Sequence, residues 1–224
     1  MLVHGAWHGA WCWDHVRRRL DVHGLANIAV DNPSVAHAPS DLAADGDNLT
    51  RVLDEVDGPV LLVGHSYGGA VITDAGAHPK VEHLLYLTAF VIDEGESVRE
   101  NNLAGGEGSR LGEAVRLKGE LTEIDPDRAV DFFFHDCEAV IAADAVSKLR
   151  PMTDDAMQGI PRQIAWRERP ATYVVCTDDR CLPVALQQSN AQRVANSVEL
   201  PTSHSPFLSR PDELAALIAD RAHG

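Results

Sequence analysis

Residues 59–70 read PVLLVGHSYGGA, an apolar run followed by a serine set between glycines. The run is typical of a strand buried on both faces, and the sequence after the serine is compatible with a helix. Residues 64–68 match Gly-x-Ser-x-Gly, whose small residues allow a sharp strand-to-helix turn. Close packing alone would explain the glycines, but such a turn also presents a serine hydroxyl at the end of the strand. Ser66 is therefore the predicted nucleophile.

The pattern around this turn predicts one α/β domain, residues 1–224. Over 1–91 and 170–224, short apolar runs alternate with amphipathic stretches, which indicates a mostly parallel sheet with helices on both faces. Residues 92–169 break this rhythm and are predicted to form a helical lid over the carboxyl ends of the strands. The glycine cluster AGGEGSRLG at 104–112 lacks the spacing of a nucleotide-binding loop, and a plain loop is expected there.

The composition of the chain disfavours several classes of binding partner. The formal net charge of −15 disfavours nucleic acid and anionic membranes, and no apolar run is long enough to cross a bilayer. The first residues lack the pattern of a signal peptide, although the first apolar run is short enough to leave an upstream start open. The cysteines lack paired spacing, and the sequence lacks an HExxH motif. We therefore expect reduced thiols, a cytoplasmic location, and no metal or other cofactor. The four cysteines are Cys12, Cys137, Cys176 and Cys181.

A nucleophilic serine needs a histidine base and an orienting acid, which in this architecture follow it in the order acid, then histidine. His204 lies in ELPTSHSPF, between the last predicted strand and the last predicted helix, where the base is expected. The acid is expected after TYVVC at 172–176, where Asp178 and Asp179 are adjacent. Consecutive side chains diverge, so only one of them faces the base, and the spacing leaves both open.

The negative charge that develops on the substrate oxygen during the reaction needs hydrogen-bond donors to stabilise it. They are expected to be the backbone N–H after the nucleophile, that of Tyr67, and one from HGAWHGAW at 4–11, which directly follows the first predicted strand. Gly5 would allow the backbone of that loop to turn toward the serine.

A family resemblance is carried by five stretches: LVHGAWHGAWCW (2–13), VGHSYGGAVIT (63–73), LYLTAF (85–90), YVVCTDDRCLP (173–183) and ELPTSHSPFLSRP (199–211). They resemble the α/β-hydrolase superfamily, in the branch of plant methyl-salicylate and methyl-ketone-type esterases, hydroxynitrile lyases and bacterial carboxylesterases. The resemblance covers roughly 1–91 and 170–221 and is loose over 92–169. It implies a triad of Ser66, His204 and Asp179, because the second acid of this turn belongs to the triad in that branch.

The resemblance also implies oxyanion donors at Ala6 and Tyr67, and a substrate site that includes Gly5, Trp7 and His65. The expected activity is hydrolysis of a small, largely apolar carboxylic ester through an acyl-enzyme. In the lyases of this branch a threonine stands at the position of Gly5 and a lysine at that of Ser205, which disfavours lyase chemistry here.

Three alternatives stay open beside the esterase: a carbon–carbon lyase, a ligand-binding receptor, and a specialised biosynthetic hydrolase or cyclase. The expected partner is a small-molecule ester, and a homodimer is left open.

Overall fold

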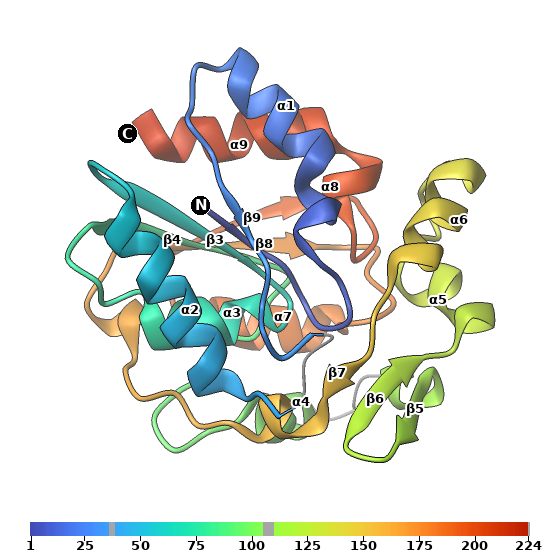
Figure 1. The fold of residues 1–224 in the computed structure, drawn as a ribbon. Helices are drawn as coiled ribbons and strands as arrows, with labels where there is room; N and C mark the ends of the chain where they lie inside the picture. Colours follow the sequence, from blue (N-terminus) through green and yellow to red (C-terminus); the bar gives the residue numbers. More distant parts are fainter. Residues whose placement is uncertain (36–38, 105–109, 224) are drawn as a thin grey trace.

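The computed structural model describes residues 1–35, 39–104 and 110–223. Its centre is a six-stranded sheet in the order β2-β1-β3-β4-β8-β9, with every neighbouring pair parallel (Figure 1). The α/β prediction with a mostly parallel sheet is thereby confirmed. The strands are β1 (Leu2–Val3), β2 (Ala29–Val30), β3 (Val60–His65), β4 (Val81–Leu87), β8 (Ala171–Cys176) and β9 (Asn196–Leu200).

Helices cover both faces of this sheet. On one face α1 (Asp14–Val22) packs beside α9 (Pro211–His223), while α2 (Leu42–Glu55), α3 (Gly68–Ala75) and α7 (Val184–Ala191) lie on the other (Figure 1). A 3-10 helix, η1 (Ala10–Trp13), precedes α1, and a short α-helix, α8 (Pro206–Ser209), precedes α9. None of the described helices is long and apolar enough to cross a membrane.

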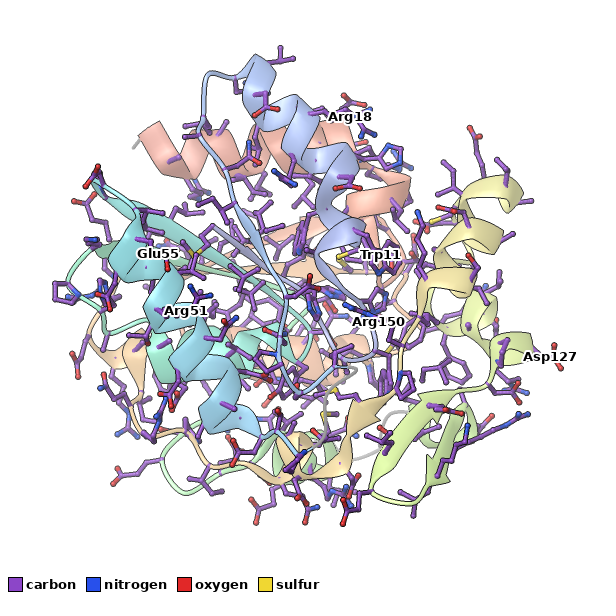
Figure 2. The ribbon with its side chains drawn as sticks, in the orientation of Figure 1. Trp11, Arg18, Arg51, Glu55, Asp127 and Arg150 are labelled. Carbon is purple, nitrogen blue, oxygen red and sulfur yellow. The ribbon has the colours of Figure 1, made fainter. Side chains whose placement is uncertain are left out.

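The helix α2 shows how local sequence selects a face. Leu42, Leu49 and Leu53 recur at helical spacing and are buried. On its outer side Arg51 and Glu55 form an ion pair of 2.6 Å one turn apart (Figure 2). The helix begins where the Asp41 carboxylate accepts the Ala44 N–H at 2.9 Å. The apolar face therefore packs on the sheet and the charged face meets water.

The segment 92–169 contains helices, as predicted, and also a three-stranded antiparallel sheet that the sequence did not indicate. That sheet has the order β5-β6-β7 and consists of β5 (Val115–Lys118), β6 (Leu121–Ile124) and β7 (Met152–Thr153). The helices and short turns of the segment are α4 (Val98–Ala104), η2 (Arg110–Glu113), α5 (Pro126–Phe133), α6 (Ala139–Lys148), η3 (Asp154–Gln158) and η4 (Ala165–Arg167). Most of the glycine cluster expected to form a loop falls at 105–109, outside the described residues.

Candidate active site

Ser66 lies in the turn between β3 and α3 with a φ of 52°, a left-handed conformation that a serine adopts at a cost of about 1–3 kcal/mol. Close packing accounts for the glycine after it: a Cβ on Gly68 would lie 2.7 Å from the Val3 carbonyl oxygen. The turn thus brings α3 against β1 and leaves Ser66 only 8% exposed. The same short stretch therefore packs α3 against β1 and places the Ser66 hydroxyl at the end of β3.

Asp179 and His204 meet at the carboxyl ends of two neighbouring parallel strands. Asp179 follows β8, His204 follows β9, and His204 Nδ1 lies 2.6 Å from Asp179 Oδ2. Since a carboxylate only accepts, Nδ1 carries the proton and Nε2 is left to act as a base. Asp178, by contrast, is exposed. Of the two acids that spacing left open, the structure brings Asp179 to His204.

The Asp179 carboxylate is surrounded by donors. Its Oδ1 accepts the backbone N–H groups of Cys181 at 2.7 Å and Leu182 at 2.9 Å. Its Oδ2 also accepts the Thr88 hydroxyl at 2.5 Å and the Gln187 amide at 3.3 Å. These bonds offset the cost of burying a charge and fix the plane of the carboxylate. Thr88, at the end of β4, and Gln187, in α7, carry no sequence signal that indicates these contacts.

His65, the residue before the nucleophile, supports the backbone of the base. Its Nε2–H donates to the carbonyl oxygen of His204 at 2.9 Å, and the two rings lie 4.6 Å apart. Its ring is fully buried and packs on Phe207 at 4.8 Å between centroids. No hydrogen bond joins Ser66 Oγ to His204 within the described part of the chain, and such bonds commonly tighten only when substrate binds. The predicted contact of His65 with substrate stays a prediction.

The first loop comes within contact distance of the nucleophile. A Cβ on Gly5 would lie 2.9 Å from Ser66 Cβ and 2.7 Å from His65 Nδ1, so only glycine permits this approach. Among the described residues, the N–H groups of Ala6 and Tyr67 have no hydrogen-bond partner. Backbone donors without partners beside a serine are what an oxyanion hole requires.

Tyr67 is anchored from α2. Its hydroxyl donates to Asp45 Oδ2 at 2.7 Å, and the same carboxylate accepts the N–H of Ser34 at 2.8 Å and its hydroxyl at 2.6 Å. Burial raises the pKa of Asp45. The sequence offered no signal for this contact, because an aspartate inside a helix usually points to solvent.

Aromatic side chains from α5 cover the base. Phe133 lies 5.7 Å from the His204 ring and 6.4 Å from Trp7, measured between centroids. Trp7 itself is 4% exposed. The cover over the His204 ring is therefore apolar, and Trp7 packs beside Phe133. That Trp7 contacts substrate stays a prediction.

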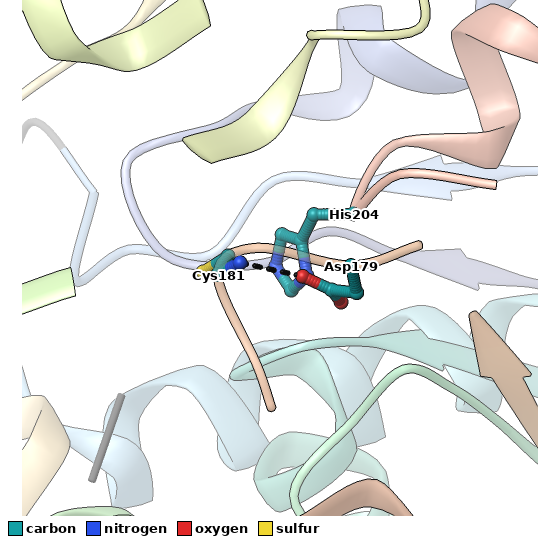
Figure 3. Close-up of side chains that lie close together, drawn as sticks. All are labelled: Asp179, Cys181 and His204. Atoms are coloured by element: carbon teal, nitrogen blue, oxygen red, sulfur yellow. Dashed lines mark hydrogen bonds and ion pairs between the residues drawn. The ribbon is translucent and has the colours of Figure 1, made fainter. Parts of the chain in front are cut away.

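Asp179, Cys181 and His204 also form a group whose potential metal-ligating atoms all lie within 4.8 Å of one another (Figure 3). Both oxygens of the aspartate already accept hydrogen bonds from the protein. A metal ion here would have to displace the bond that orients His204. The arrangement therefore fits acid–base chemistry better than a metal centre.

Two further histidines are buried beside the site. Burial lowers the pKa of His8 to about 3 and the pKa of His65 well below its ordinary value. The unfolded chain binds these protons at pH values below about 6.5, whereas the folded chain does not. The free energy of unfolding should therefore be unaffected by them above pH 6.5 and should fall as pH drops toward 3, by up to about 1.4 kcal/mol per pH unit for each histidine.

We expect His8→Gln to reduce this acid sensitivity by about one proton, while the exposed His23→Gln leaves it unchanged. Urea unfolding of the wild type and both variants at pH 7.5, 6.5 and 5.5 measures the slope. Equal slopes in all three proteins would show that His8 is not held neutral by the fold.

Comparison with known proteins adds to this geometry. A sequence profile described as the alpha/beta hydrolase family matches residues 1–217. The chain is 30% identical over 247 residues to the pyrethroid hydrolase of Sphingobium wenxiniae, across 99% of this chain and 86% of that protein. It is 27% identical over 266 residues to methylesterase 7 of Arabidopsis thaliana, across 99% of this chain and 95% of the relative. A solved pyrethroid hydrolase from Sphingobium faniae superposes with a TM-score of 0.88 at 26% identity, covering 100% of this chain and 96% of that one.

Proposed function

This chain belongs to the alpha/beta hydrolase family and is a carboxylic ester hydrolase, and from that premise we propose that Ser66, His204 and Asp179 cleave a small, largely apolar ester through an acyl-enzyme. The observation that carries the proposal is the 2.6 Å hydrogen bond between His204 and Asp179. The ring of His65, the residue before Ser66, lies 4.6 Å from the His204 ring, and the left-handed turn at Ser66 presents its hydroxyl at the end of β3.

In the proposed mechanism His204 Nε2 takes the Ser66 hydroxyl proton as Oγ attacks the ester carbonyl carbon. Asp179 stabilises the resulting imidazolium, and the N–H groups of Ala6 and Tyr67 bind the oxyanion. The tetrahedral intermediate collapses, and His204 returns the proton to the departing alkoxide, which leaves as the alcohol. Water, deprotonated by His204, then attacks the acyl carbon, the acid is released and the proton returns to Ser66 Oγ.

An apolar substrate is supported by the surroundings of the site. Phe133 and Phe134 are fully buried at the end of α5, and Phe133 lies against both His204 and His8. A methylesterase and a pyrethroid hydrolase among the relatives agree with an ester whose acyl or alcohol part is apolar. Transfer of the apolar group of the substrate from water into the site would supply most of the binding affinity.

Lyase chemistry is disfavoured by two positions. A side chain at Gly5 would collide with His65 Nδ1, so the threonine found there in lyases of this branch has no room. Ser205 stands where those lyases carry a lysine, and its buried hydroxyl supplies no positive charge.

The experiment is a panel of short-chain aryl esters, methyl esters and an aromatic cyanohydrin, assayed with pure protein. Ester hydrolysis with no cleavage of the cyanohydrin is expected. Cyanohydrin cleavage without ester hydrolysis would instead establish the lyase. Tight product binding without turnover of any ester would indicate a receptor.

A further inference from the structure

We propose that the small sheet β5-β6-β7 and Arg150, which precedes β7, set the geometry of the oxyanion hole, with Thr122 as the main positioning residue. The proposal rests on the proposed function, since it concerns the loop that would supply the Ala6 N–H. Thr122 lies on β6, far from Ser66 in sequence, and would act only through Trp7.

The carbonyl oxygens of the loop that carries Ala6 accept hydrogen bonds from neighbouring side chains. His4 Nδ1 donates to the Gly5 carbonyl at 2.8 Å, a tautomer fixed by the Asn32 N–H, which donates to His4 Nε2 at 3.0 Å. His8 Nδ1 donates to the Ala6 carbonyl, also at 2.8 Å. Within the described residues the Ala6 N–H is left without a partner. The carbonyl oxygens of this loop therefore accept hydrogen bonds from within the protein, while the Ala6 N–H stays available as a donor.

Trp7 follows Ala6 with a φ of 60°, a conformation that bulky side chains rarely adopt unless neighbours impose it. Its indole N–H donates to the Thr122 hydroxyl at 3.0 Å, and that hydroxyl donates to the Met152 carbonyl at 3.2 Å. Trp7 and Thr122 are both buried, so water cannot replace either bond. One threonine hydroxyl therefore connects the strained residue to strands β6 and β7.

Arg150, just before β7, adds a second tie (Figure 2). Its backbone N–H donates to the Trp7 carbonyl at 2.8 Å, and its guanidinium Nη2 donates to the His8 carbonyl at 3.3 Å. The same nitrogen reaches Asp31 Oδ1 at 2.8 Å, which also accepts the Ala10 N–H at 2.9 Å. The carbonyls of residues 5–8 all accept a hydrogen bond, and those of Trp7 and His8 depend on the inserted segment.

An oxyanion hole lowers the barrier because its donors are already oriented when charge develops on the oxygen. Loss of the bond between Thr122 and Trp7 would let the loop relax from its left-handed conformation and turn the Ala6 N–H. Such a loss acts on the transition state more than on the bound substrate, so kcat falls while KM changes little.

Thr122→Val removes the hydroxyl and keeps the shape of the side chain. We expect kcat for the best ester of the panel to fall about tenfold with KM within twofold, and Thr122→Ser to keep kcat within twofold. Thr172→Val is the matched control, because it removes one hydroxyl, bonded to His83 at 3.0 Å, from the start of β8. It should leave kcat unchanged.

Trp7→Phe removes the same hydrogen bond from the other side and replaces Thr122→Val as the test if that variant does not fold. In the Trp7→Phe background Thr122→Val should lower kcat no further, because the bond is already absent. An unchanged kcat in Thr122→Val, or an equal fall in Thr172→Val, would overturn the positioning role while leaving the esterase intact. A wild type inactive on every ester would instead contradict the proposed function.

Discussion

Replacing Ser66 with alanine is expected to lower kcat by about 10⁴-fold or more on any ester that the wild type hydrolyses. The reason is chemical, because the proposed mechanism uses the Ser66 hydroxyl for the attack and alanine has no hydroxyl. Alanine keeps the Cβ, so the turn at φ 52° is no more strained than with serine, and α3 should still pack on β1. The loss should therefore come without unfolding.

The measurement is steady-state hydrolysis with a thermal unfolding curve for each protein. A Ser66→Ala variant that melts within a few degrees of the wild type and is inactive supports the assignment. Turnover retained in a preparation free of other esterases would contradict it.

Asp179→Asn is expected to lower kcat by about 10⁴-fold. The amide oxygen of the asparagine must occupy the Oδ1 position, because two backbone N–H groups, those of Cys181 and Leu182, point at it. Its NH₂ group then faces His204 Nδ1, where it can only donate. The imidazole would be driven to carry its proton on Nε2, and it could no longer accept a proton from Ser66.

The neighbouring acid supplies a matched control. Asp178→Asn changes the same charge one residue away on an exposed side chain, and kcat should stay within twofold. Equal losses in the two variants would show that net charge, and not the orientation of His204, governs the rate. A larger loss in Asp178→Asn would assign the acid to the other position.

Much of this site follows from local sequence. The glycine–serine turn after an apolar run located Ser66, and chain order located His204, because parallel strands bring their carboxyl ends to one edge of the sheet. The choice of Asp179 needed the family resemblance, since spacing treats both acids alike. The structure separates the two acids, because only the Asp179 carboxylate accepts the N–H groups of the following turn.

The supports of the site escaped sequence analysis because they join residues distant in the chain. Thr88 reaches Asp179 across 91 positions, and Trp7 reaches Thr122 across 115. No periodicity marks such contacts. The strands β5 and β6 were missed for a related reason: they are four residues each, and β5 carries mostly exposed side chains, so neither shows a buried apolar run.

Covalent labelling identifies the nucleophile by its chemistry. Trypsin releases residues 52–80 as one peptide, in which Ser66 is the only serine. After reaction with a fluorophosphonate, mass spectrometry should find one adduct per chain, located on Ser66 of that peptide and lost together with activity in Ser66→Ala. An adduct on another residue that abolishes activity, or full hydrolysis by a chain in which Ser66 is blocked, would contradict the assignment of Ser66 as the nucleophile.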